Sequence, residues 1–315
     1  MELKEYLISE FVEDYIERHL TRRQALQRIA AVSGSMAMAT SILAACGPQQ
    51  PPAPIATAAA TAAATGTAVP PTATPSTPNV AANDPAIQAQ DVQFPGQGAT
   101  ILGYLARPQG NGPFSAVLVC HENRGLLEHI KDVTRRVAKA GYVGLSVDLI
   151  SRQGGTDKVD AAQVSGILGN ADEAQMVGDF ASGWNYLKTL PYVRKDGAGM
   201  MGFCFGGGIT WRVATKLPEL KAAVPFYGPN PRDLADVANI KAAVLGLYGE
   251  LDQRINAGIP AIEAEMTKNG KTFEKIIYPN ASHAFHNDTG QSYNAAAARD
   301  GWAKAMAWFE KYLKA

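Results

Sequence analysis

The stretch GMMGFCFGGG at residues 199–208 decides the fold: an apolar run stops at Cys204, which has a glycine two residues away on each side. We predict a strand, a sharp turn and the start of a helix, because Gly202 and Gly206 are small enough to let the two elements pass close together. The positive end of that helix dipole would favour the thiolate form of Cys204. Cys204 is therefore a candidate nucleophile, and the alternative is a buried structural cysteine.

Length and composition predict one large folded domain with extensions. The chain has 315 residues, of which 46% are hydrophobic, so it can bury a full core. Lys and Arg together number 29, as do Asp and Glu, and this balance argues against a nucleic-acid partner. The cysteines, Cys46, Cys120 and Cys204, are too far apart in sequence for a close-spaced zinc pattern. We predict neither a bound metal nor another cofactor.

The first 46 residues resemble an export signal. Residues 1–20 have the apolar spacing of a short amphipathic helix, which we expect to be solvated and to serve only as a lead-in. Twin arginines, Arg22 and Arg23, then precede a weakly apolar segment at 29–45. The sequence Leu-Ala-Ala-Cys that ends at Cys46 is similar to a bacterial lipoprotein processing box. This resemblance implies export, lipidation of Cys46 and attachment to the extracytoplasmic face of the cell membrane. An uncleaved membrane anchor and an ordinary helix are the alternatives.

Composition divides the rest of the chain at about residue 84. Residues 47–83 consist mostly of Pro, Ala, Thr and Gln with hardly a charge. Such a segment cannot bury enough surface to fold, so we predict a disordered tether. Residues 84–315 have the length of one ordinary domain.

Apolar periodicity in this domain alternates between strands and helices. An antiparallel pair is predicted first, at 92–95 and 100–106, and further strands follow, of which the run at 115–120 is apolar throughout, as suits a parallel strand buried on both faces. These later strands are predicted at 115–120, 142–147, 197–203, 222–227, 242–248 and 273–278. Helices are predicted at 126–140, 172–190, 206–216, 259–269 and 293–313. The alternation predicts a mostly parallel, doubly wound α/β sheet with helices on both faces and a ligand site at the carboxyl ends of the strands.

A nucleophilic cysteine needs a base and an acid that orients the base, and both follow later strands of the predicted sheet. Asp252 follows the second strand beyond the cysteine turn, and His283 follows the last strand. There His283 would take the thiol proton of Cys204, and Asp252 would fix the tautomer of the imidazole. Glu250 is an alternative acid. His286 could exchange roles with His283 or form a metal pair with it, although we find no further ligands for such a pair.

The loop CHENRG at 120–125 directly follows the first buried strand. A loop in this place can supply one N–H group of an oxyanion hole, and the residue after the nucleophile supplies the other. We therefore predict that the backbone N–H groups of Asn123 and Phe205 hold the oxyanion. Cys120 is interpreted as a buried residue at the end of a strand.

Taken in order, these residues closely resemble the dienelactone hydrolase family of α/β-hydrolases. The match comprises the nucleophile, acid and base together with Glu122 and Arg152, and it extends from about residue 90 to the C-terminus. The resemblance implies that Glu122 contacts the resting thiol until substrate binds, and that Arg152 grips a substrate carboxylate. A salt bridge between Glu122 and Arg124 and a surface position for Arg152 are the alternatives.

The sequence departs from the best-known members of this family at two places. After His283 they carry a second substrate-binding arginine, whereas residues 283–288 read HAFHND here. The loop at 121–125 also differs, and Arg124 could supply the missing charge. These differences leave the natural substrate open, and the sequence does not indicate the oligomeric state.

The sequence predicts a hydrolase that cleaves a small ester or lactone through a Cys-His-Asp triad and a thioester intermediate. Its only predicted partners are a small-molecule substrate and the membrane that holds the lipid anchor. The alternatives are a carboxylesterase for larger esters and a non-catalytic lipoprotein that binds ligands on the same fold. An intact set of Cys204, Asp252 and His283 argues against the binding protein, which has no need of all three.

Overall fold

A computed structural model describes residues 2–16, 19–46 and 80–314. Its centre is an eight-stranded sheet in the order β1-β2-β4-β3-β5-β6-β7-β8. The strands are β1 (Ile87–Gly96), β2 (Ala99–Pro108), β3 (Phe114–Cys120), β4 (Val143–Val147), β5 (Val193–Phe203), β6 (Leu220–Phe226), β7 (Ala243–Gly249) and β8 (Phe273–Tyr278). β2 pairs antiparallel with β1 and β4, and all other pairs are parallel. The predicted α/β-hydrolase fold, with its mostly parallel sheet, is confirmed.

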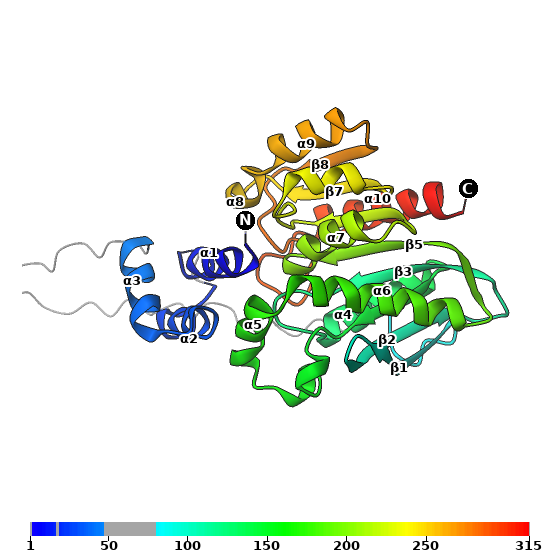
Figure 1. The fold of residues 1–315 in the computed structure, drawn as a ribbon, viewed down its shortest axis with the longest axis horizontal. Coiled ribbons are helices and arrows are strands. Elements are labelled where there is room, and N and C mark those ends of the chain that lie inside the picture. The colour runs from blue at the N-terminus through cyan, green and yellow to red at the C-terminus, as the bar shows by residue number, and fades with distance from the viewer. Residues whose placement is uncertain (1, 17–18, 47–79, 315) are drawn as a thin grey trace, which may run out of the picture.

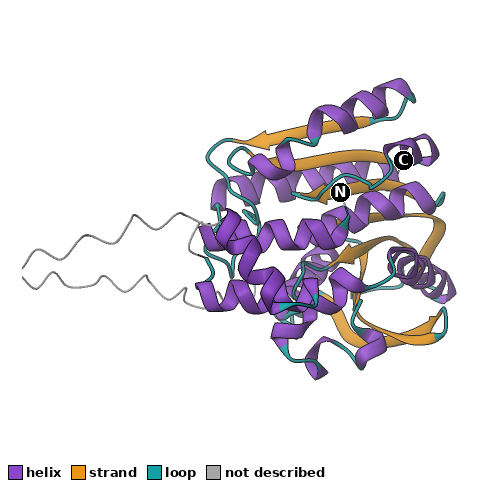
Figure 2. Ribbon diagram, turned by 60° about the vertical axis from the view of Figure 1, so that its left-hand side comes forward, coloured by secondary structure: helices purple, strands orange, loops and turns teal. Residues whose placement is uncertain are grey.

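Helices cover both faces of this sheet (Figures 1 and 2). The helices after β3 are α4 (Glu128–Lys139), α5 (Ala161–Asn170), α6 (Glu173–Thr189), α7 (Phe205–Lys216), α8 (Gln253–Asn256), α9 (Ile259–Lys268) and α10 (Ala295–Leu313). A Cβ on Gly144 would meet α4, and one on Gly199 would meet α10. Gly144 and Gly199 both align with Val117 of β3 and so share one face of the sheet. Gly183 of α6 and the start of α7 pack on the other face.

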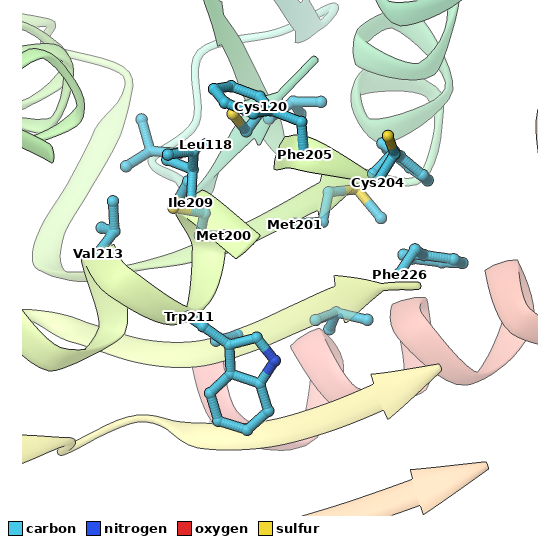
Figure 3. Packing of buried hydrophobic residues seen from close by; sticks show 14 of the residues in the cluster. Leu118, Cys120, Met200, Met201, Cys204, Phe205, Ile209, Trp211, Val213 and Phe226 are labelled. Atoms are coloured by element: carbon cyan, nitrogen blue, oxygen red, sulfur yellow. The ribbon is translucent and has the colours of Figure 1, made fainter. Parts of the chain in front are cut away.

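The central strands β3, β4 and β7 are mostly apolar because both of their faces are covered. β4 and β7 are buried along their whole length, and β3 along nearly all of it. Figure 3 shows the side chains beneath the end of β5, where Leu118, Met200 and Ile209 pack between the sheet and α7. This packing gives the Cys204 turn a rigid base.

The predicted elements are present with small shifts at their ends. β1 begins at Ile87 rather than at 92, because it pairs with β2 along its full length. Helix α5 was not predicted; it is capped by Asp160, whose side chain accepts a hydrogen bond from the N–H of Ala162. The fold also starts earlier than residue 84. Val80 is buried, and its N–H donates to Asp132 at 2.8 Å.

The N-terminal segment forms three helices beside α5, at the end of the domain seen at the left of Figure 1. These are α1 (Leu3–Ile16), α2 (Arg22–Ser33) and α3 (Met36–Cys46). The expectation of a solvated lead-in helix is wrong for α1, because Tyr6, Leu7 and Phe11 are all 0% exposed. An amphipathic helix has the same apolar spacing whether its apolar face is free or packed on a domain. The sequence therefore did not reveal that α1 packs against the hydrolase domain.

Two features of the predicted export region can be compared with the structure. Among the described residues, no helix is both long and apolar enough to cross a membrane. Residues 47–79 of the predicted linker lie outside the described part of the chain. Cys46 is the last residue of α3.

Candidate active site

Cys204 lies at the carboxyl end of β5, between the strand and α7, with a φ of 59°. The glycines on each side are required by the close packing of this turn. A Cβ on Gly202 would lie 2.2 Å from the carbonyl oxygen of Gly206, and one on Gly206 would lie 2.4 Å from that of His121. The side chain of Cys204 is buried, and the N-terminus of α7 begins at the next residue. The predicted strand–turn–helix is confirmed.

Asp252 and His283 meet at the same edge of the sheet. Asp252 follows β7 and caps α8 by accepting a hydrogen bond from the N–H of Ile255, which fixes its carboxylate. His283 follows β8, and its Nδ1 lies 2.5 Å from Oδ2 of Asp252. The bond leaves Nε2 of His283 free to face the nucleophile, as the predicted acid–base pair requires.

The hydrogen bond between Asp252 and His283 shifts the pKa values of the two side chains in opposite directions. Burial lowers the pKa of His283, but the charge of Asp252 and its hydrogen bond outweigh burial and raise it well above its ordinary value. Burial raises the pKa of Asp252, and the partner imidazole reverses this effect and lowers it. The carboxylate therefore stabilises the imidazolium that forms when His283 accepts a proton.

The thiol of Cys204 lies near His283 without being hydrogen-bonded to it. A ring nitrogen of His283 and Sγ lie within 4.8 Å of each other. Among the described residues, Nε2 of His283 is buried and has no hydrogen-bond partner. The candidate base therefore lies next to the candidate nucleophile.

Two residues of α1 contact the thiol instead. Sγ of Cys204 lies 3.3 and 3.4 Å from the two carboxylate oxygens of Glu10, and 3.4 Å from the hydroxyl of Tyr6. Burial and the charge of Glu10 raise the pKa of Cys204 to about 11, although His283 acts in the opposite direction. Sequence reasoning missed both residues. Their one signal was that Glu10 is spaced by three and four residues from Leu7 and Tyr6, on the apolar face of the helix.

Of the two predicted oxyanion donors, Asn123 lines the pocket that contains Cys204, and Phe205 directly follows Cys204 at the start of α7. Asn123 is buried, and its carbonyl accepts a hydrogen bond from Ser165 of α5 at 3.0 Å. Its side-chain amide donates to Oε1 of Glu10 at 2.5 Å. Within the described part of the chain, the backbone N–H groups of Asn123 and Phe205 donate no hydrogen bond, so both could serve an oxyanion.

Glu122 does not contact the thiol, contrary to the role that the resemblance implied. Its carboxylate accepts a hydrogen bond from Asn287 at 2.8 Å, and its other oxygen is buried without a partner among the described residues. It forms no ion pair with Arg124 in the described part of the chain. Asn287 holds Glu122 aside, while Glu10 occupies the place beside Sγ.

Arg152 is also not at the site. Its guanidinium binds both oxygens of Asp179, at 2.6 and 2.9 Å, because this buried carboxylate of α6 needs a cation. Arg124 instead lines the pocket that contains Cys204 and His283, together with Arg28 of α2. Burial and the charge of Arg124 both lower the pKa of Arg28.

The remaining candidates have structural roles. Glu250 accepts a hydrogen bond from the N–H of Asn280 at 2.9 Å. His286 stacks on Phe203 at 5.0 Å between ring centroids, and burial lowers its pKa to about 3, so it is neutral. Cys120 is a buried free thiol, as expected.

The active-site pocket has a volume of about 360 Å³, and residues of α1 and α2 form part of its wall. Within it, one ligand atom each from Glu10, Cys204 and His283 lies within 4.8 Å of the others. Thiolate, imidazole and carboxylate are ligands that zinc accepts, so this is the group in the described residues that could hold a metal. The same arrangement also suits a nucleophile, its base and a carboxylate that contacts the nucleophile.

Comparisons with known proteins agree with this geometry. The model of the "Dienelactone hydrolase family" matches residues 101–313. The chain belongs to the dienelactone hydrolase family. A Methylorubrum extorquens protein described as "Putative carboxymethylenebutenolidase" is 39% identical over 276 residues, which cover 81% of this chain and 92% of that protein.

Solved structures extend the likeness to three dimensions. The crystal structure of a "Putative Dienelactone Hydrolase" from Klebsiella pneumoniae has 32% sequence identity and a TM-score of 0.68. The match covers 72% of this chain and 100% of that one. A dienelactone hydrolase-like promiscuous phosphotriesterase from metagenomic libraries has 26% identity and a TM-score of 0.65, over 72% and 99% of the two chains. This member of the dienelactone hydrolase family is therefore a carboxylic ester hydrolase that acts on esters or lactones.

Proposed function

We propose that this enzyme hydrolyses a small ester or lactone through Cys204, His283 and Asp252. The observation that carries the proposal is the Asp252–His283 hydrogen bond of 2.5 Å beside a cysteine at a strained turn. A carboxylate that fixes the imidazole tautomer next to a buried thiol is the arrangement that nucleophilic catalysis requires.

The chemistry has two steps. His283 removes the proton from Cys204, and Sγ attacks the substrate carbonyl while the N–H groups of Phe205 and Asn123 stabilise the oxyanion. The imidazolium then returns the proton to the leaving alkoxide, and a thioester remains. Water, deprotonated by His283, attacks the thioester, and the acid product leaves as the thiol is restored.

The pocket supports a substrate that carries a negative charge. Arg124 lines the pocket beside Cys204, and an arginine fork suits a carboxylate. We propose a lactone with a carboxylate substituent as the substrate class, with Arg124 in the role that the resemblance gave to Arg152.

Hydrolysis by the full chain tests the mechanism. The panel consists of an activated short-chain ester, a neutral lactone and a carboxylate-bearing dienelactone, and the variants are Cys204→Ala and, as matched control, Cys120→Ala. We expect measurable turnover that disappears only in Cys204→Ala, with preference for the charged lactone. Turnover that survives Cys204→Ala would contradict the triad. Mass spectrometry of a rapidly quenched reaction should show an acyl group on the peptide that contains Cys204.

We also propose that the chain is exported and anchored by lipid at Cys46, on the extracytoplasmic face of the cell membrane. The support is the sequence alone: Arg22, Arg23 and the box that ends at Cys46. Cell fractionation of the full chain and of Cys46→Ser tests this. We expect the full chain in the membrane fraction with a lipid on Cys46, and the variant released or unprocessed. The same unlipidated product from both would contradict the anchor.

A further inference from the structure

We propose that helix α1 is a built-in inhibitory segment, which occupies the catalytic pocket and must leave before substrate can reach Cys204. The inhibitory role rests on the proposed triad, because it takes Cys204 as the nucleophile. The structural evidence for it is the set of contacts that α1 makes.

The thiol is covered by α1. Two oxygens of Glu10 and the hydroxyl of Tyr6 all lie within 3.4 Å of Sγ, and Cys204 is only 3% exposed. A carbonyl carbon that accepts the nucleophile must approach to about 3–3.5 Å, which is the space that these three oxygens fill. The docked state is therefore a resting state.

Glu10 occupies this space as an acid product would. Its carboxylate accepts hydrogen bonds from the Cys204 thiol and the Asn123 side chain, and the charge of His283 attracts it. An ester hydrolase leaves a carboxylate in this position after each turnover. Glu10 thus competes with both substrate and His283 for the thiol.

The enzyme holds α1 with contacts that have no other evident purpose. The guanidinium of Arg254, two residues after Asp252, lies 4.6 Å from the ring centroid of Tyr6, and its Nε donates to Glu13 at 2.8 Å. Leu7 and Phe11 are completely buried by the contact. Burial of two such apolar side chains favours docking of α1.

Helix α5 provides a fitted surface for the same segment. A Cβ on Gly166 would lie 2.7 Å from the carbonyl oxygen of Ala31 in α2, and one on Gly169 would lie 3.0 Å from Leu7 in α1. Asn170 donates a hydrogen bond to the carbonyl of Val32 at 3.1 Å. Small residues and a matched donor on the hydrolase domain indicate a built interface rather than a chance contact.

The fold does not need this segment. The Klebsiella pneumoniae structure is matched over its whole length by 72% of this chain. Processing at Cys46, as proposed above, would remove α1 and α2 together and expose the nucleophile. The export signal would then also keep the enzyme inactive until it is exported.

A thiol-accessibility measurement tests the inhibitory role without any substrate. The rate of iodoacetamide alkylation of Cys204 in the full chain is followed by peptide mass spectrometry, together with hydrolysis of the activated ester. The variants are Leu7→Asp, which charges the buried face of α1, and Gly166→Ala, which pushes α2 away. Gly178→Ala is the matched control. It adds the same methyl group to helix α6, where the nearest atom to the new Cβ would be 3.9 Å away.

We expect alkylation to accelerate about tenfold or more in Leu7→Asp and less in Gly166→Ala, because the rate follows the fraction of molecules in which α1 has left. Gly178→Ala should match the unmodified chain. Ester turnover should rise in the same order. Equal alkylation rates in all four proteins, with thermal melts that show an intact domain, would overturn the proposal. Faster alkylation without turnover on any substrate would uphold the inhibitory segment and count against the proposed hydrolysis.

Charge at the thiol gives a second readout. The ionisable groups that interact with Cys204 are Glu10, Tyr6, His283, Glu122, Cys120 and Tyr227. Glu10→Gln removes the charge that opposes thiolate formation, so the pH profile of alkylation should move to lower pH, whereas Glu5→Gln on the exposed face should leave it in place. An unchanged profile in Glu10→Gln would contradict the role of Glu10.

Discussion

At the scale of single residues, the site depends on one carboxylate fixing one imidazole. Asp252 is only 1% exposed and is held by its cap on α8, so its geometry is independent of solvent. We predict that Asp252→Asn keeps the fold but lowers kcat/KM for the activated ester about 10³- to 10⁴-fold, because the amide holds the wrong tautomer of His283. Steady-state kinetics with a thermal melt as the folding control checks this. A loss below tenfold would place the acid elsewhere.

We expect Arg124 to affect substrate binding and Arg152 to affect the stability of the fold. Arg124→Ala should raise KM for the carboxylate-bearing lactone about tenfold, because one cation–carboxylate contact is lost, and should leave the free energy of unfolding unchanged. Arg152→Ala should leave KM unchanged and lower the free energy of unfolding by about 3 kcal/mol, because Asp179 stays buried without its cation. Kinetics and urea unfolding of both variants are the measurements. The reverse pattern would restore Arg152 to the substrate site.

At the scale of elements, the turn between β5 and α7 tolerates no side chain at Gly202. A Cβ there would lie 2.2 Å from the carbonyl oxygen of Gly206, within rigid backbone. We predict that Gly202→Ala lowers the free energy of unfolding by about 3 kcal/mol, because the strand and the helix must separate. Urea unfolding checks this against Gly178→Ala, which has room for its methyl group. Equal stability of the two variants would mean that the turn can relax.

Element-level patterns were also where prediction from sequence succeeded most fully. The uniformly apolar runs at 115–120 and 242–248 predict buried parallel strands, and the structure has β3 and β7 there. Helix α5 was missed because its sequence AAQVSGILGN lacks a clear apolar face, and the burial of Val164 and Leu168 supplies the stability that its own pattern does not.

At the scale of the whole molecule, a buried ion cluster joins α4 to the loop after β8. Asp288 lies 3.1 Å from Nδ1 of His129 and 2.6 Å from the guanidinium of Arg136. Burial raises the pKa of Asp288, but the hydrogen bonds from His129 and Arg136 and the charge of Arg136 outweigh it and lower the pKa well below its ordinary value of 3.8.

The sign of this shift predicts an acid-sensitive fold. A carboxyl with a lowered folded-state pKa contributes stability above its unfolded pKa, and the contribution is lost as the pH falls through the folded pKa. The free energy of unfolding should therefore decrease as the pH falls below about 4, and Asp288→Asn should show a flatter acid profile with lower stability at neutral pH. Circular dichroism with urea at several pH values measures this. Parallel profiles for both proteins would assign the acid sensitivity to other carboxyls.

The sequence by itself determined the sheet, the nucleophile turn and the acid–base pair. Each depends on local signals that have one structural solution: glycines around Cys204, apolar runs of strand length, and Asp252 and His283 directly after strands whose carboxyl ends share one edge. The tertiary structure alone decided which charges meet the thiol. Arg152 pairs with Asp179 and Glu122 with Asn287, whereas Glu10, 194 positions before Cys204, lies against Sγ. Such contacts depend on how separate elements pack, because an amphipathic helix shows that it needs a partner but does not show which surface will be that partner.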